Sequence, residues 1–333
     1  MFASKAPFGA YRAPDSLEML EFEAEADSLH GILRSSSGRT YPVVAGIPNF
    51  VTRQNLSDSD LASLDWYHHN AITYDEYLPL TFRTLKVDES SEREKIIAEL
   101  QLGPGLRVLE TGCGSGRDSL RIANEMGEGE LYLQDISEDI LRFAVENFQD
   151  AAGGPSVHFA VANGYELPFP ENYFDRTFHF GGLNTFGDKT RALLEMARVT
   201  KPGGIVLVGD ESIPTWMRDT DFARILMNSN PHFSYTVPLE SIPQCASNLK
   251  LQWIMGDAFY LISFQKRDGD PSGDFDFEIP GWRGGTHRKR YFGQLEGVSP
   301  HIKAAVIARA KKEGASVSAW LEKSLLPLVE DEI

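Results

Sequence analysis

A glycine-rich stretch near the middle of the chain has one acid directly beside it. In RVLETGCGSGRDS, residues 107–119, a short apolar run leads to Glu110 and then to three glycines at alternate positions: Gly112, Gly114 and Gly116. Glycine-rich turns that follow a strand usually hold a phosphate, and a carboxylate there would repel one. A dinucleotide fingerprint also needs glycine at its sixth place, which here is Arg117 or Ser119. The segment therefore disfavours NAD and favours a cationic ligand.

S-adenosylmethionine is a cation that suits such a turn, because it carries a sulfonium and an α-ammonium and has no phosphate. We expect Glu110 to accept a hydrogen bond from the ammonium, directly or through water. The glycines would let the backbone approach the methionine part closely. Asp135, at the end of the next strand, is placed to hold both ribose hydroxyls, and Ile136 would pack on the adenine.

The elements around this turn alternate between apolar runs and helical patterns. Strands are expected at 107–111, 129–137, 157–163, 173–182 and 201–212, with two more within 249–267 that turn at Gly256-Asp257. Helical patterns follow the first, second and fourth of these strands. Strands that alternate with helices predict a mostly parallel sheet covered on both faces.

Four segments, in order and in spacing, carry a family resemblance: VLETGCGSGRDS, LQDIS, ANGYELPFPENYFD and ARVTKPGGIVLVGDE. They resemble the class I S-adenosylmethionine-dependent methyltransferases, especially the small-molecule group that includes the ubiquinone/menaquinone methyltransferases. The resemblance covers roughly residues 85–265. It implies an α/β fold with a Rossmann-like seven-stranded methyltransferase sheet, mostly parallel and closed by an antiparallel hairpin.

The resemblance also implies a set of cofactor-binding residues: Glu110, Thr111, Gly112, Gly114, Gly116, Asp135, Ile136, Asn163 and Gly164. In the family, the position of Asn163 is usually an aspartate that hydrogen-bonds the adenine amino group. An asparagine carbonyl can accept the same bond.

Methyl transfer is an in-line displacement at carbon, so the enzyme mainly aligns acceptor, methyl group and sulfur. The acceptor should lie beyond the carboxyl ends of the strands. Catalytic candidates there are His179 and Glu211, although for His179 a packed, hydrogen-bonded histidine is the favoured interpretation. Candidates for substrate binding are mostly aromatic: Tyr74, Tyr77, Asn184, Trp216, Phe233 and Tyr235. They predict a small apolar or aromatic acceptor, although about half of such a set should belong to the core.

Composition narrows the alternatives. The 333 residues include 48 acids against 32 lysines and arginines, a net charge of −16 that makes nucleic acid an unlikely partner without a local basic patch. The two cysteines, Cys113 and Cys245, support neither a disulfide framework nor a thiolate zinc site, so no metal is predicted. With no signal-peptide core in residues 1–16 and no apolar run of eighteen residues, we expect a soluble, cytoplasmic protein without a membrane span.

Both ends extend beyond the core region, 103–267. Residues 1–52 resemble a small zinc-ribbon domain, but Arg34 and Ser37 occupy the places of its thiolates, so we expect a β-rich segment held by packing. Residues 53–102 are expected to form a helical lid and lead-in, in which Ser90 or Ser91 caps the last helix.

After a linker at 268–286, residues 287–333 resemble a ribbon-helix-helix segment with the order strand, helix, helix. Ser299 with Pro300 and Ser316 should begin the two helices, and Gly314 should end the first. We expect this tail to form a homodimer or to dock on the enzyme's own surface. Two alternatives to a small-molecule enzyme stay open: a ribosomal or transfer RNA methyltransferase, and a non-catalytic regulator whose tail binds DNA or a partner.

Overall fold

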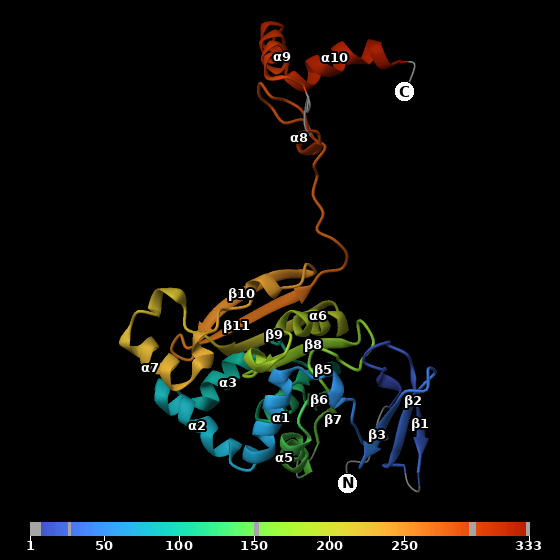
Figure 1. The fold of residues 1–333 in the computed structure, drawn as a ribbon, viewed down its shortest axis with the longest axis vertical. Coiled ribbons are helices and arrows are strands. Elements are labelled where there is room, and N and C mark those ends of the chain that lie inside the picture. Colours follow the sequence, from blue (N-terminus) through green and yellow to red (C-terminus); the bar gives the residue numbers. More distant parts are fainter. Residues whose placement is uncertain (1–7, 26–27, 150–152, 293–297, 331–333) are drawn as a thin grey trace. The chain divides into compact units, whose positions relative to one another are not determined.

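The computed structural model describes residues 8–25, 28–149, 153–292 and 298–330. The chain divides into two compact units, Met1–Gly269 and Asp270–Ile333. The first unit contains two sheets, and the second consists of helices and irregular segments (Figure 1).

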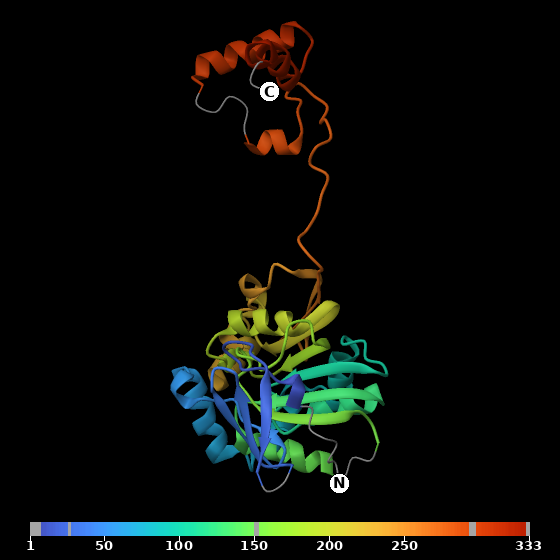
Figure 2. The ribbon, with the colours of Figure 1, turned by 90° about the vertical axis from the view of Figure 1, so that its right-hand side faces the viewer.

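A seven-stranded sheet lies at the centre of the first unit (Figures 1 and 2), with the strand order β10-β11-β9-β8-β5-β6-β7. Its strands are β5 Leu106–Thr111, β6 Gly129–Asp135, β7 Ser156–Val161, β8 Phe174–Phe180, β9 Thr200–Glu211, β10 Ala246–Ile254 and β11 Phe259–Lys266. Strands β5 to β9 pair in parallel, and β11 pairs antiparallel with β9 and β10. The α/β fold class and the closing hairpin, which turns at Gly256 and Asp257, are confirmed.

Helices cover both faces of this sheet. Its connecting helices are α4 Arg117–Met126, α5 Glu138–Gln149 and α6 Lys189–Val199. Successive residues of a strand point to opposite faces, so Val108 packs with α4 and α5 while its neighbour Leu109 packs on the side of α6. Buried apolar side chains on both faces of the strands form two large clusters, which fix the sheet and with it the ends of its strands.

A four-stranded antiparallel sheet precedes this core: β1 Leu20–Ala24, β2 Gly31–Ser35, β3 Thr40–Val44 and β4 Ile47–Pro48. Tyr11, which precedes β1, packs its ring against Tyr132 and Phe169 of the core. The backbone N–H of Phe50 donates to the carbonyl of Val161 on the edge strand β7 (2.8 Å). The expected packing against the core is therefore observed, and it covers a sheet edge (Figure 2).

At the two positions expected to correspond to zinc-ribbon thiolates, the side chains make other interactions. Arg34 pairs with Glu23 (2.6 Å), and the hydroxyl of Ser37 donates to the carboxylate of Glu18 (2.8 Å). Within the described ranges, no group of three or more histidine, cysteine and acidic side chains is arranged to hold a metal ion.

The remaining helices of the first unit are α1 Asp58–Asn70, α2 Tyr74–Leu85, α3 Glu89–Ala98 and α7 Asp221–Ser229. Helix α1 starts with a capping box formed by Ser57 and Asp60. The expectation that Ser90 or Ser91 caps α3 is wrong. Asp88 is the cap, because its carboxylate accepts from the N–H of Ser91 (2.9 Å), and the helix begins earlier than the serines suggested.

The second unit contains α8 His287–Phe292, α9 Pro300–Lys312 and α10 Val317–Val329. The strand expected at the start of this segment is wrong for residues 287–292, which are helical because the Thr286 hydroxyl accepts from the N–H of Lys289 (3.1 Å). Residues 293–297 lie outside the described ranges.

The expected boundaries of the last two helices are confirmed. Ser299 precedes Pro300 at the start of α9, and Gly314, with a left-handed φ of 67°, follows its end. Ser316 caps α10 by accepting from the N–H of Ala319 (3.2 Å). Of the helices that the structure describes, none is long and apolar enough to cross a membrane.

Candidate functional site

The glycine loop joins β5 to α4 at the carboxyl end of the central sheet. Gly112 has a left-handed φ of 65°, and a Cβ at this position would come within 3.0 Å of the His179 ring. Gly116 occupies the N-cap position of α4. Position 112 requires glycine because its backbone is left-handed and because the His179 ring leaves no space for a Cβ. A ligand can therefore approach the backbone of the loop closely at this point.

Glu110, the residue before the last one of β5, lines a cavity of about 680 Å³. Its carboxylate accepts a hydrogen bond from the Ser119 hydroxyl (2.5 Å). Burial, and secondarily the nearby Asp118 carboxylate, raises the pKa of Glu110 well above its usual range. A cationic ligand beside this carboxyl would favour its charged form.

Asp135, at the end of β6, braces the glycine loop. One carboxylate oxygen accepts from the N–H of Gly114 and the other from the N–H of Ser137, both at 2.9 Å. Burial raises the pKa of Asp135 to about 6, although these backbone hydrogen bonds act in the opposite direction. The loop after β6 is therefore tied to the glycine loop before any ligand binds.

A second, narrower cavity is lined by His179 and by five of the expected cofactor residues: Gly112, Asp135, Ile136, Asn163 and Gly164. The side-chain oxygen of Asn163 accepts from the backbone N–H of Tyr165 (3.1 Å), while its amide nitrogen has no partner within the described ranges. Thr111 lines neither this cavity nor the larger one. Its buried hydroxyl accepts from the side-chain amide of Gln134, so its contribution is to packing.

His179, near the end of β8, lies on the cofactor side of the site. Its Nδ1–H donates to the carbonyl of Thr111 (2.7 Å), and its buried Nε2 has no partner among the described residues. Burial lowers the pKa of His179, which favours the neutral ring. Its ring contacts Phe186, with 4.8 Å between centroids. His179 does not line the large cavity.

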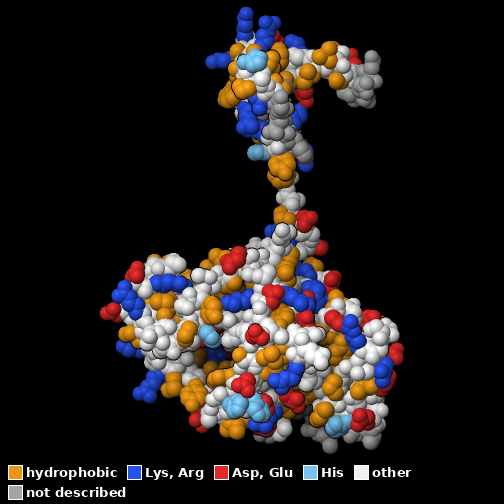
Figure 3. All heavy atoms as spheres, in the orientation of Figure 1, with side chains coloured by type: hydrophobic (Ala, Val, Ile, Leu, Met, Phe, Trp, Pro, Cys, Tyr) orange, Lys and Arg blue, Asp and Glu red, His pale blue; other side chains and the backbone are white. Residues whose placement is uncertain are grey.

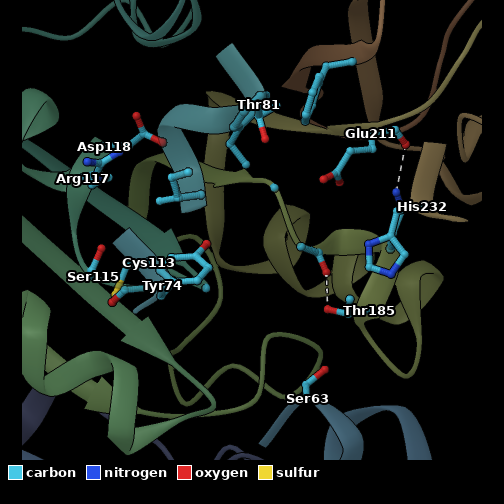
Figure 4. Close-up of a pocket in the computed structure, with 18 of the residues that line it drawn as sticks. Ser63, Tyr74, Thr81, Cys113, Ser115, Arg117, Asp118, Thr185, Glu211 and His232 are labelled. Carbon is cyan, nitrogen blue, oxygen red and sulfur yellow. Dashed lines mark hydrogen bonds between the residues drawn. The ribbon is translucent and has the colours of Figure 1, made fainter. Parts of the chain in front are cut away.

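The large cavity has mostly aromatic and aliphatic walls. On one side they come from α1 and α2: Trp66, Tyr67, Tyr74, Leu78 and Phe82. On the other side they come from the strand ends, the loop after α7 and the hairpin: Phe180, Tyr235, Met255 and Phe259. In Figure 4, Tyr74 lies beside Cys113 of the glycine loop, and the Glu211 carboxylate points into the cavity from the other side.

The first of these walls is attached to the glycine loop. The Ser115 hydroxyl donates to Asp75 of α2 (2.7 Å), and Arg117 pairs with Glu89 of α3 (2.8 Å). At the start of α1, the Ser59 hydroxyl donates to the carbonyl of Thr185 (2.7 Å). Helices α1 and α2, the expected lid, cover this side of the cavity, and polar contacts with the core hold both ends of the pair.

The opposite end of the cavity carries a pair of neighbouring carboxyl groups at the end of β9. Asp210 is fully buried and accepts from the N–H of Asn184 (2.5 Å) and of Glu211 (2.8 Å). Burial, followed by repulsion from Asp210, raises the pKa of Glu211 well above its usual range. Lys189 donates to the side-chain oxygen of Asn184 (3.2 Å) and lies over the Tyr235 ring.

Three of the six predicted substrate-binding residues line the cavity: Tyr74, Asn184 and Tyr235. The other three do not, and their placement corrects the prediction. Tyr77 lies off the face of α2 that covers the cavity and is exposed. Trp216 is 71% exposed and packs edge-on against Trp253. Phe233 is buried against Phe259 and belongs to the hydrophobic core.

Several lining residues were not predicted from the sequence. Leu78 and Phe82 follow Tyr74 at helical spacing, so the face of α2 that covers the cavity could have been recognised from its period. The place of Arg93 in the cavity wall could not have been recognised in this way, because it depends on a buried ion pair with Asp118 (2.6 Å) that joins α3 to α4. For Met255 and Phe259, at the hairpin, the sequence offered only their apolar character, which does not distinguish a cavity wall from the core.

Comparison with known proteins agrees with this geometry. A family profile described as a methyltransferase domain matches residues 102–259. The ubiquinone/menaquinone biosynthesis C-methyltransferase UbiE of Bordetella avium is 40% identical over 113 residues, which is 34% of this chain and 43% of the relative. UbiE of Vibrio cholerae is 39% identical over 112 residues, with 33% and 43% covered. The chain thus spans less than half the length of these relatives.

Among solved structures, the chain is similar to the complex between the Haloferax volcanii Trm112 methyltransferase activator and a methyltransferase, with a TM-score of 0.47, 15% identity, and coverage of 63% of this chain and 98% of that one. The matched profile, the glycine loop with Glu110, and the strand order of the sheet all concern the same part of the molecule. Residues 102–259 of this chain match the profile of a methyltransferase domain, and these similarities support the class I, S-adenosylmethionine-dependent type.

Proposed function

We propose that the chain is an enzyme that transfers the methyl group of S-adenosylmethionine to a small, apolar or aromatic metabolite. One observation carries this proposal: a single cavity of about 680 Å³ joins the glycine loop and Glu110 to walls that are mostly aromatic and aliphatic. A site that binds donor and acceptor in one enclosure can align them for in-line displacement. Apolar walls with few polar groups are typical of small-molecule sites.

The residues at the cofactor end fit the donor. The bound cofactor supplies an electrophilic methyl group on a sulfonium. Glu110 would accept from its α-ammonium. For the cofactor's carboxylate, the cavity wall offers the buried Arg93, which also pairs with Asp118. Asp135 would accept hydrogen bonds from the ribose hydroxyls in place of the bond that it accepts from the Gly114 N–H. Ile136 would contact the adenine.

At the acceptor end, we propose that Glu211 takes up the proton of an acceptor that must lose one. Of the described residues, no lysine or arginine forms an ion pair with its carboxyl group, which lines the cavity beside Asn184. A raised pKa makes this carboxylate a stronger base than an exposed glutamate. His179 holds the Thr111 carbonyl and packs on Gly112, so we assign it a positioning role.

The relatives support an acceptor with a ring. They are C-methyltransferases of ubiquinone and menaquinone biosynthesis, and quinones are ring compounds with large apolar surfaces. Net charge supports a small molecule over RNA, because acids outnumber lysines and arginines by 48 to 32. On the face of the first unit seen in Figure 3, acidic and basic side chains are interspersed.

Two measurements test the proposed function. Calorimetry of the full chain with S-adenosylmethionine and S-adenosylhomocysteine should give saturable binding at one site, and its absence would rule the proposal out. Labelled-methyl transfer to extracts should then label small lipophilic metabolites. Label in RNA, in a parallel reaction, would instead support a nucleic-acid substrate.

We propose in addition that two chains pair through the second unit. Its described helices bury few apolar side chains and expose several on α9 and α10: Ile302, Ile307, Leu325, Leu326 and Leu328. A twofold axis that pairs these helices would cover the same apolar side chains on both copies. Light scattering should give a dimer for the full chain and a monomer for residues 1–269. A monomeric full chain would contradict the pairing.

A further inference from the structure

Helix α1 covers the narrow cavity, and its one buried residue is a carboxylate. Of the thirteen residues of α1, all of which the structure describes, only Asp60 is buried. Asp60, Ser63 and Tyr67 recur at helical spacing and line the narrow cavity from the side of α1. An element with few buried apolar contacts opens more easily than the core to which it is attached. Helix α1 is therefore a wall of the cavity that can move.

The Asp60 carboxylate joins α1 to two loops of the cavity wall. It accepts a hydrogen bond from the Tyr165 hydroxyl, in the loop after β7, and another from the backbone N–H of Gly187, in the loop after β8 (3.3 Å). Ser57 donates to the same carboxylate from its backbone N–H (2.9 Å) and from its hydroxyl (2.6 Å). These four residues form a polar cluster, the Asp60 cluster, which holds the start of α1 against both loops.

The same contacts hold the side chain that narrows the cavity. Phe186 lines the cavity beside Gly164, where a Cβ would overlap its ring. The segment that carries Phe186 is bound to α1 on both sides of this residue. Gly187 is bound through the Asp60 cluster, and the carbonyl of Thr185 accepts from the Ser59 hydroxyl (2.7 Å). The gap between α1 and the two loops cannot widen while these hydrogen bonds hold.

In this closed form the cavity is too small for a nucleoside. Its volume is about 50 Å³, whereas a single water already needs about 10–15 Å³. The opposite wall carries Asp135 and Ile136, to which the proposed function assigns the ribose and the adenine of the cofactor. For adenosine to occupy this place, α1 and the loop after β7 must move apart, and the bond between Tyr165 and Asp60 must break.

We infer that the Asp60 cluster is an autoinhibitory contact, which the free protein makes and which the cofactor must displace. This inference rests on the proposed binding of S-adenosylmethionine at this site. A protein whose binding-competent form is a minor population binds its ligand more slowly and more weakly by that fraction. Weakening the cluster therefore speeds association and raises affinity, whereas loss of a contact that only supports the fold would do neither.

The substitution Tyr165→Phe tests the inference in the full chain. It removes one bond to Asp60 and leaves the carboxylate its three other donors, two from Ser57 and one from Gly187, so the fold should be retained. Stopped-flow fluorescence with S-adenosylhomocysteine should show association at least about tenfold faster than in the wild type, as expected for one lost hydrogen bond to a charged group. Affinity, measured by calorimetry, should rise by up to the same factor.

A second variant weakens the closure at another point. Ser59→Ala removes the exposed bond to the Thr185 carbonyl, and it should speed association about two- to fivefold. Thermal unfolding of each variant without ligand identifies a folding defect. If Tyr165→Phe does not fold, Ser59→Ala decides the inference by the same criterion.

Tyr77→Phe, on an exposed part of α2, also removes a tyrosine hydroxyl and serves as the matched control. Its association rate and its affinity should equal those of the wild type. An association rate in Tyr165→Phe that is equal to or below the wild-type rate would overturn the inference while leaving the proposed function intact. Failure of the wild-type protein to bind S-adenosylhomocysteine would overturn both.

Discussion

The two ends of the large cavity are built in different ways. The cofactor end comes from three loops within residues 110–165, joined by hydrogen bonds such as that from the Gly114 N–H to Asp135. The acceptor end is assembled from distant parts of the chain: the lid, the loop after β8, the end of β9, the short helix at Pro231–Ser234 and the hairpin. The proposed cofactor-binding groups thus depend on local structure, and the proposed acceptor-binding groups depend on long-range packing.

The ends share one feature, a buried carboxyl group without a basic partner among the described residues. At the cofactor end it is Glu110, and at the acceptor end it is Glu211. Burial raises the pKa of both. The comparison suggests different uses, since a permanent cation beside Glu110 would keep that group charged, while Glu211 is free to exchange a proton with the acceptor.

The largest effect is expected from Glu211→Gln. Loss of the proton acceptor should lower the turnover number by about 100- to 10,000-fold with an acceptor that must lose a proton, and affinity for S-adenosylmethionine should change less than about twofold. Single-turnover kinetics and calorimetry measure the two quantities separately. If both fell together, Glu211 would belong to the cofactor end, and the distinction between the two ends would fail.

A pH effect on stability is expected from Asp135. Its pKa is about 6 in the folded protein against 3.8 as the ordinary value, so the folded state binds the proton more tightly than the unfolded state. The corresponding stabilisation, about 3 kcal/mol, is complete below pH 3.8 and is lost as the pH rises through about 6. Chemical unfolding without ligand, followed from pH 4 to 7, measures it. Asp135→Asn should show a smaller fall over this window, and an identical fall would assign the effect to other groups.

Glu110→Gln should weaken binding of S-adenosylmethionine by about 10- to 100-fold, because a neutral amide loses the charge-assisted bond to the ammonium. Glu125→Gln, on the exposed side of α4, is the matched control and should leave binding unchanged. Calorimetry at several pH values adds a second readout. Wild-type affinity should rise with pH until the Glu110 carboxyl is ionised, and this dependence should be reduced in the variant.

The smallest effect is expected at the lid. Asp75→Ala removes the bond from the Ser115 hydroxyl and the longer contact with Arg117 (3.4 Å). Because Asp75 is partly exposed, cofactor affinity should fall only about two- to fivefold. Stopped-flow kinetics should show that this loss of affinity comes from faster dissociation of the cofactor. A loss of 100-fold would mean that the lid, and not the loops, determines cofactor binding.

Much of the cofactor end could be predicted from the sequence, because its signals are local. The acid beside three glycines, the strands at their observed positions and the turn at Gly256-Asp257 depend on neighbouring residues and on period. Predictions from local sequence were wrong where more than one nearby residue could cap a helix or start it. Asp88 caps α3 in place of the adjacent serines, and Thr286 begins a helix where the resemblance implied a strand.

The chain by itself determined the order of strands and helices, the glycine loop and the acid that adjoins it, since backbone preference and hydrophobic period act over a few residues. Only the tertiary structure decided which aromatic residues face the cavity. Phe233 and Tyr235 are two positions apart, yet one enters the core beside Phe259 and the other lines the cavity. That choice depends on the space left by elements far away in the sequence, and no local pattern encodes it.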